Sequence, residues 1–252
     1  MHENLSRRRF VGAAATGAAA LSAAAWAAEQ PSKTPATDPH AKTILDAHVH
    51  LKHGDAARTE YSAQVIVQTM DAVGIGQAIV FAMSTTTRRS IEMAEAAVCQ
   101  YPQRLIPYVY ALPHYERPVI QEIEAALKGG RFRGVKIHVG ECTLAEYVID
   151  PVLRLAGKCG ALCLVDLGGR LDVAQRMAQG FPDTRLVIAH MGRYLAKDAA
   201  LIDQFIQLAE QHRNVVLDIS GVVLVWCPPP ALGKMFTAVG HSPPASRGTG
   251  DR

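Results

Sequence analysis

Short apolar, β-branched runs alternate along the chain with segments of helical periodicity. Seven apolar runs predict strands, at residues 43–51, 77–83, 105–113, 134–140, 161–168, 186–192 and 215–222. Between them, apolar positions recur at helical spacing in residues 62–73, 88–101, 118–127, 144–158, 171–179 and 198–212. Strand and helix thus alternate in units of about 25 to 35 residues, which predicts an α/β fold with a parallel sheet.

Two architectures fit this alternation, an open doubly wound sheet and a (β/α)8 TIM-type barrel. A doubly wound nucleotide-binding sheet usually has a glycine-rich turn after its first strand. This chain has histidines there instead, in ILDAHVHLKHG (44–54), which favours the barrel. We expect the barrel to be incomplete, with about seven strands. After a helix-like segment at 231–239 the sequence reads HSPPASRGTGDR, whose prolines and glycines do not suit a buried eighth strand.

The first 42 residues differ in composition from those that follow. Residues 1–28 combine Arg7, Arg8 and Arg9 with an alanine-rich segment and a small-x-small pattern around Trp26. This pattern predicts a twin-arginine-type signal peptide and a periplasmic location. A transmembrane anchor or a disordered leader is the alternative, but the apolar run is short and rich in alanine. We expect no stable membrane anchor after signal removal.

Proline, serine and threonine mark the next boundary. Residues 29–42 carry three prolines and have linker composition, so the ordered barrel domain is expected over residues 43–240 and an irregular tail over 241–252. The abrupt change of composition after Gly240 indicates a C-terminally truncated barrel. A missing strand would leave the first and seventh strands with unpaired edges, which makes a homo-oligomer plausible.

Composition and charge exclude some classes of partner. The chain of 252 residues is 49% hydrophobic and 19% charged, which is an ordinary globular composition. Its formal net charge is only +3, and three of the cations lie together in the predicted leader, so no nucleic-acid partner is expected. The five cysteines form no C-x-x-C pair, and we interpret them as small buried hydrophobes.

The first predicted strand carries the strongest chemical signal. Strand alternation puts Asp46, His48 and His50 on one face, which in a barrel is the interior. Burying imidazole or carboxylate without partners costs several kcal/mol, on the order of 2–7 for a neutral polar group. A divalent metal bound by two imidazole nitrogens would remove this cost. Core histidines satisfied by hydrogen bonds are the alternative.

Polar residues recur where other predicted strands end, at the edge where barrel enzymes build their sites. They are Lys136 and His138 after the fourth strand, Asp166 after the fifth, His190 after the sixth, and Asp218 and Ser220 after the seventh. Each has a structural alternative: loop or helix capping for Asp166 and His190, and hydrogen bonding between strands for Asp218 and Ser220.

These motifs resemble a known family. DAHVHL, GVKIH, LVIAHMG and NVVLDISG, in this order and with YPQRLIPYVYALP between the first two, are similar to the amidohydrolase-related metal-dependent hydrolases. This branch of the amidohydrolase superfamily includes lactonases and the aminocarboxymuconate-semialdehyde decarboxylase type. The resemblance covers roughly residues 44–240 and implies a metal-binding TIM barrel.

The resemblance implies roles for individual residues. His48 and His50 match the two metal ligands of the H-x-H motif, and His190 matches a histidine that contacts water or substrate, so we expect it to act in catalysis as acid, base or oxyanion partner. Relatives add a histidine after strand five, where this chain has Asp166, which we expect to be the third metal ligand. Relatives also add an aspartate after strand eight. Asp251, in GTGD, only faintly echoes that residue.

The sequence therefore predicts a metal-dependent hydrolase of a small-molecule carbonyl substrate such as a lactone, amide or ester. One divalent metal, Zn2+ or Mn2+, is expected on His48, His50 and Asp166, with Lys136 and His138 contacting substrate. Two alternatives stay open: a decarboxylase of a small unsaturated carboxylate on the same site, and a truncated, non-catalytic remnant. A periplasmic binding protein would need a second lobe that the length does not supply.

Overall fold

A computed structural model describes residues 44–113, 119–194 and 198–221 of the chain. The predicted signal peptide (1–28), linker (29–42), helix-like segment (231–239) and tail (241–252) lie outside the described residues, as do Cys227 and Asp251. The part described belongs to one compact unit that begins at Thr43.

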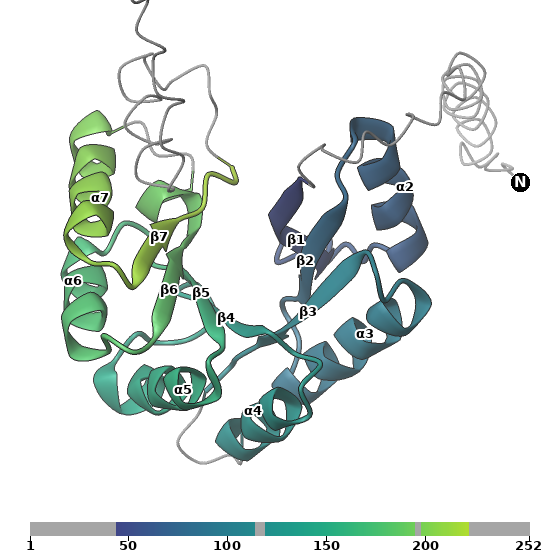
Figure 1. Cartoon of the computed structure of the whole chain (residues 1–252), viewed down its shortest axis with the longest axis horizontal. Helices are drawn as coiled ribbons and strands as arrows, with labels where there is room; N and C mark the ends of the chain where they lie inside the picture. The colour runs from purple at the N-terminus through teal and green to yellow at the C-terminus, as the bar shows by residue number, and fades with distance from the viewer. Residues whose placement is uncertain (1–43, 114–118, 195–197, 222–252) are drawn as a thin grey trace, which may run out of the picture. The chain divides into compact units, whose positions relative to one another are not determined.

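Seven parallel strands form one sheet in chain order, from β1 to β7. The strands are β1 (Leu45–Lys52), β2 (Gln77–Ala82), β3 (Leu105–Tyr110), β4 (Gly134–His138), β5 (Leu162–Asp166), β6 (Arg185–Ile188) and β7 (Val215–Leu217). The sheet curls into a half-barrel, and the helices lie along its outer side (Figure 1). Within the described residues, the predicted fold, a (β/α)8 barrel that is incomplete at about seven strands, is confirmed.

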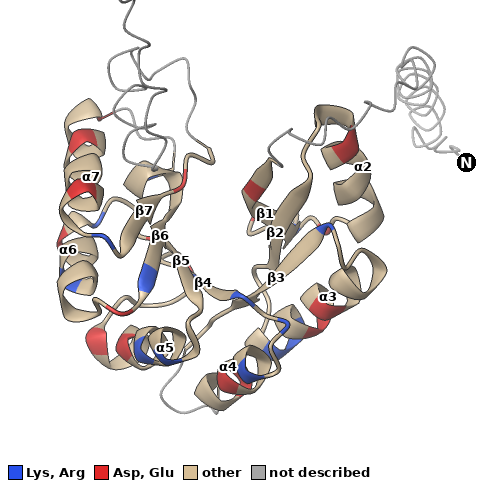
Figure 2. Cartoon of the chain, in the orientation of Figure 1, with Lys and Arg blue, Asp and Glu red and all other residues tan. Residues whose placement is uncertain are grey.

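Each connection between neighbouring strands contains a helix. The helices are α2 (Ala63–Val73), α3 (Thr87–Gln100), α4 (Val119–Lys128), α5 (Glu146–Cys159), α6 (Leu171–Gly180) and α7 (Ala199–Gln211). Three of them begin with a side-chain cap, in which Ser62, Thr86 or Asp198 accepts a hydrogen bond from a backbone N–H of the first turn. More charged residues lie on the helices than on the strands (Figure 2).

The core lies between the helices and the outer face of the sheet. It is built from strand residues such as Val80, Val135 and Val165, packed against helix residues such as Ile123 and Leu153. A smaller apolar cluster on other strand positions includes Phe81, Tyr108 and Tyr110. Alternate strand residues therefore serve two different packing surfaces, as the period-two pattern requires.

The sixth strand is shorter than predicted. It ends at Ile188, and a 3-10 turn, η1 (Ala189–Gly192), follows it. His190 and Met191 have φ angles of 57° and 52°, and Gly192 has a φ of 98°, so this backbone cannot continue a strand. Two features require glycine at position 192. Its φ is positive, and a Cβ there would lie 2.2 Å from ring carbons of Phe205.

The edge strands β1 and β7 each have one neighbour among the described strands. Leu45 and Val216, which lie on these edges, are 47% and 40% exposed, an unusual exposure for apolar strand residues. Nevertheless, the side chains of His48 and Asp218 meet across the opening. The sheet therefore curls far enough to bring its two ends together at one site.

Two further sequence interpretations can be compared with the structure. The interpretation of the cysteines was wrong in part: Cys163 is buried, but Cys99 and Cys159 are exposed because they lie at or near the ends of α3 and α5. Among the described residues, no helix has both the length and the apolar character needed to cross a membrane.

Candidate metal centre

His48 is held at both ring nitrogens. Its Nδ1 lies 2.5 Å from Oδ2 of Asp218, and its Nε2 lies 3.2 Å from Nζ of Lys136. Because a carboxylate only accepts hydrogen bonds and an ammonium only donates them, the proton of the neutral ring is on Nδ1. Burial lowers the pKa of His48 despite the hydrogen bond that its Nδ1–H donates to Asp218, so the ring is neutral near pH 7.

Asp218 and Ser220 join this histidine to the seventh strand. The Ser220 hydroxyl donates to Asp218 Oδ2 at 2.7 Å, and the Ser220 backbone N–H donates to Asp218 Oδ1 at 2.7 Å. Burial alone would raise the pKa of Asp218, but its hydrogen bonds with His48 and Ser220 and the charge of His48 outweigh burial and lower it. Asp218 is therefore an ionised, buried carboxylate directed at His48.

His190 lies beside His48, with ring centroids 4.7 Å apart and planes at 27°. Its Nδ1 lies 2.7 Å from the carbonyl oxygen of Ser220, which only accepts, so Nδ1 carries a proton. Its Nε2 lies 3.5 Å from Oδ2 of Asp166. The left-handed turn after β6 is what directs this ring back toward the first strand.

Asp166 has partners of its own. Its Oδ2 lies 3.2 Å from His138 Nε2, and its Oδ1 accepts the backbone N–H of Gly168 at 3.0 Å. Burial would raise the pKa of Asp166, but the hydrogen bonds from His138, His190 and Gly168 lower it well below its usual value. Asp166 is thus an ionised carboxylate that orients two histidines.

The tautomer of His138 follows from its neighbours. The backbone N–H of Gly140 donates to His138 Nδ1 at 3.0 Å, so the proton of the neutral ring is on Nε2 and is directed at Asp166. The side chain of His138 is 27% exposed. It can therefore reach solvent or substrate while its orientation is fixed.

His50 is the unsatisfied member of the site. Its ring stacks on His48 with centroids 5.1 Å apart, and its Nδ1 is buried without a hydrogen-bond partner among the described residues. Burial, together with the nearby charges of His48 and Lys136, lowers the pKa of His50 to about 2. A buried imidazole nitrogen with a free lone pair is what a metal ligand would present before its ion is bound.

Lys136 lies behind His48 and is fully buried. Burial lowers its pKa to about 8, although the charges of Asp166 and Asp218 act in the opposite direction. Its ammonium group also lies 5.4 Å from the centre of the Phe81 ring. Its visible role is to hold His48, and the expected contact of Lys136 with substrate stays a prediction.

Three potential metal-ligand atoms lie close together. One atom each from His48, His190 and Asp218 lies within 4.8 Å of the other two. Imidazole nitrogen and carboxylate oxygen form the donor set that zinc and similar ions prefer. With the unpartnered Nδ1 of His50 nearby, these residues fit a divalent metal, whose binding would displace the protons from the ligating imidazole nitrogens. Of the three predicted ligands His48, His50 and Asp166, only His48 belongs to the converging group.

A pocket of about 530 Å³ opens onto these side chains, and we call it the histidine pocket. Its lining includes all five histidines of the site region, His48, His50, His53, His138 and His190, together with Asp166 and Ser220. The pocket lies where the strands end and their loops begin, which is the usual location of barrel active sites.

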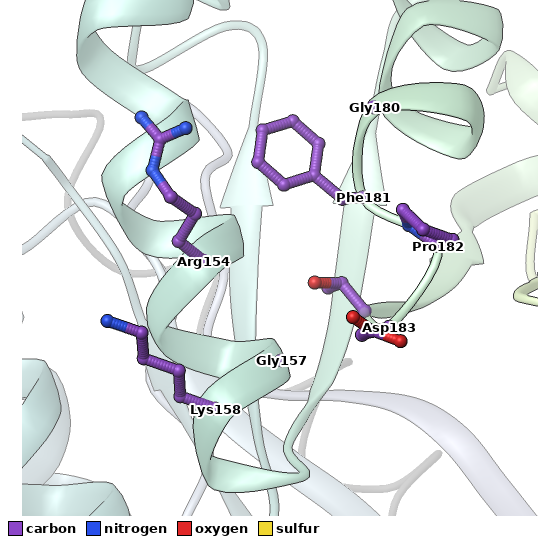
Figure 3. A pocket seen from close by; sticks show the side chains of 8 residues that line it. Arg154, Gly157, Lys158, Gly180, Phe181, Pro182 and Asp183 are labelled. Carbon is purple, nitrogen blue, oxygen red and sulfur yellow. The ribbon is translucent and has the colours of Figure 1, made fainter.

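A second hollow of about 480 Å³ lies between α5 and the segment that leads from α6 into β6. Arg154 and Lys158 extend from α5, and Phe181 and Asp183 face them from the other wall (Figure 3). This hollow is at the amino end of β6, away from the histidines. It is therefore not the candidate metal centre.

The sequence indicated most of the residues of this site but not which of them contact one another. His48, His50, His138, Asp166 and His190 all line the histidine pocket. Asp218 and Ser220 stand out in the sequence as polar residues after the seventh strand, but nothing in the sequence shows that they touch His48. Glu141 and Tyr194, which also line the pocket, have no sequence signal.

The described half-barrel brings histidines and carboxylates together around a pocket at its strand ends, which is the arrangement of a metal-binding α/β-barrel protein. The sequence model of the amidohydrolase family matches residues 45–247. The chain therefore belongs to the amidohydrolase family, as the motifs predicted. A search of curated proteins finds no match to this chain.

Solved structures share the fold at low sequence identity. An amidohydrolase from Burkholderia multivorans with bound zinc is 16% identical, with a TM-score of 0.62 over 79% of this chain and 81% of that one. A probable 2-pyrone-4,6-dicarboxylic acid hydrolase from Acinetobacter baumannii with bound citric acid is 17% identical, with a TM-score of 0.56 over 78% and 77%. The manganese complex of 5-carboxyvanillate decarboxylase from Novosphingobium aromaticivorans is 17% identical, with a TM-score of 0.50 over 69% and 66%.

Proposed function

We propose that this chain is a metal-dependent hydrolase of small carbonyl compounds such as lactones, esters or amides. The observation that supports this proposal best is the convergence of His48, His190 and Asp218 within 4.8 Å, beside a pocket of about 530 Å³. The three residues, with His50 next to them, would hold one divalent ion, and zinc suits this donor set best. A bound divalent ion supplies a Lewis acid for the carbonyl oxygen and makes water nucleophilic near neutral pH.

The protein's own residues orient the histidines of the site. Asp218, Ser220 and Lys136 fix the ring of His48, so that it is held in one orientation at the metal centre. Asp166 Oδ2 lies 3.5 Å from Nε2 of His190, so this carboxylate orients the His190 ring and stabilises a proton on Nε2. His138 is aligned by the same carboxylate and lies at the partly exposed side of the pocket.

The test is metal analysis of the purified full chain, followed by hydrolysis of lactones and 4-nitrophenyl esters before and after treatment with a chelator. We expect about one metal per chain, loss of turnover on chelation and recovery on adding Zn2+. His48→Asn should lose metal and turnover, while His212→Asn, on the capping residue of α7, should keep both.

Other outcomes point to the two alternative functions. Metal-dependent release of CO2 from small carboxylates, without ester or lactone hydrolysis, would replace the proposal by a decarboxylase. Stoichiometric metal without turnover of either substrate class would indicate a non-catalytic remnant. The periplasmic location and self-association remain predictions that fractionation and sedimentation would test.

A further inference from the structure

Glu141 is the carboxylate of the histidine pocket that the proposed chemistry does not use. It lies just after β4, and its partners come from the ends of β2 and β3. Ser84 donates to it twice, from its backbone N–H at 3.1 Å to Oε2 and from its hydroxyl at 2.5 Å to Oε1. The hydroxyl of Tyr110 donates to Oε2 at 2.5 Å.

These donors fix the carboxylate in place. Tyr110 is fully buried, and burial together with Glu141 raises its pKa, so the phenol remains a donor. Ser84 has a φ of 52°, a left-handed conformation that is rare for a residue other than glycine. Its two hydrogen bonds to Glu141 compensate for this strain, which makes movement of the carboxylate costly.

No cation neutralises Glu141 within the described part of the chain, since all three of its side-chain partners there are neutral donors. The described residues that line the histidine pocket also include no lysine or arginine. An ionised carboxylate has about four acceptor positions. Three are used here, two on Oε2 and one on Oε1, so one position on Oε1 is free.

Gly54 leaves that free position open. It borders the pocket, and a Cβ at Gly54 would lie 3.4 Å from Glu141 Oε1. A side chain at this position would therefore cover the oxygen. Because Gly54 is not in the left-handed region, alanine is compatible with its backbone.

The converging ligand atoms belong to β1 and to the segments after β6 and β7, whereas Glu141 is held by the ends of β2, β3 and β4. A substrate in the pocket can therefore place its carbonyl at the metal centre and its far end at Glu141. We propose that Glu141 determines specificity by binding a cationic or hydrogen-bond-donating group, such as an ammonium, at the non-reacting end of the substrate.

This inference rests on the proposed function for the reacting end, but binding can test it alone. The probes are pentan-1-amine, pentan-1-ol and pentanoate, which share one carbon chain and differ in charge. Their affinities for the metal-loaded full chain would be measured by calorimetry at pH 7, where the amine is protonated. We expect the ammonium to bind about 10- to 100-fold more tightly than the alcohol, as for a hydrogen bond to a charged group.

Three variants locate the effect. Glu141→Gln should reduce the amine-to-alcohol ratio to about one and should not weaken pentanoate. Gly54→Ala keeps the charge and covers the oxygen, so it should weaken the amine roughly 10-fold, and it provides the test should Glu141→Gln not fold. Glu146→Gln, a matched change at an exposed residue at the start of α5, should leave the ratio unchanged.

Equal binding of the amine and the alcohol to the wild-type protein would overturn the inference, and so would a ratio that survives both Glu141→Gln and Gly54→Ala. The outcome is independent of turnover. If the chain binds the ammonium through Glu141 but hydrolyses nothing, the inference stands and the proposed function fails.

Discussion

Asp218 and Asp166 are the two carboxylates that could complete the metal centre, and exchanging each for asparagine separates them. Asp218 is the only carboxylate among the converging ligand atoms, whereas Asp166 faces two histidines. Zinc binding of about 10–16 kcal/mol shared by four ligands gives about 2.5–4 kcal/mol per ligand. We therefore expect Asp218→Asn to lower Zn2+ affinity roughly 100- to 1000-fold, and Asp166→Asn to lower it about 10-fold, as for an outer partner.

The same substitution has a calculable effect on stability without metal. Asp218 is 5% exposed in its side chain and makes three hydrogen bonds, two through Oδ2 and one through Oδ1. An asparagine has one acceptor oxygen, so its amide nitrogen must face a donor, and at least one charge-assisted bond is lost. The expected loss is about 1.5–3 kcal/mol, which is smaller than a typical total stability of roughly 5–15 kcal/mol.

Both quantities are measurable on chelator-treated proteins. Urea unfolding followed by circular dichroism gives the stability loss, and competition with a chromophoric chelator gives the Zn2+ affinity. The reasoning is refuted if Asp218→Asn binds zinc like the wild type while Asp166→Asn does not. That result would return the third ligand to Asp166, as the sequence alone suggested.

Two further substitutions test other parts of the argument. The folded-state pKa of His50 is about 2 and the ordinary value is 6.5, so between these pH values the unfolded chain takes up a proton that the folded chain does not. The free energy of unfolding of the chelated protein should therefore fall as pH drops below 6.5. His50 alone should account for a loss of about 2 kcal/mol at pH 5. Urea unfolding of His50→Gln should show a shallower pH dependence, and an unchanged slope would contradict the burial argument. Gly192→Ala should destabilise the protein by roughly 3 kcal/mol or more, because of its positive φ and its contact with Phe205. Gly180→Ala, in open space, should change the thermal midpoint little, and similar midpoints for both variants would refute the role of Gly192.

The fold was predictable because its signals are local. Apolar runs and helical spacing identify all seven strands and all six described helices to within a few residues. The largest deviations occur after β6 and β7, where the predicted strands continued through His190 and Asp218. The sequence LVIAHMG reads as a strand, and only the packing of Gly192 against Phe205 shows why the backbone must turn there.

The site was predictable in its residue types and only partly in its contacts. The alternation of β1 places His48 and His50 on one face, and both line the histidine pocket. Which carboxylate meets His48 depends instead on how far the sheet curls. Asp166 and Asp218 are equivalent in the sequence, as carboxylates after the fifth and the seventh apolar runs, and only the distance of 2.5 Å from His48 distinguishes Asp218.

The hydrogen bond between His48 and Asp218 joins residues 170 positions apart in the chain. During synthesis, His48 therefore leaves the ribosome long before its partner Asp218, after most of the described strands have been made. Closing so long a loop is entropically expensive, and contacts of this kind form late in folding. Metal binding by these side chains would consequently report that β7 has reached β1, so the rate of metal uptake would measure this late step of folding.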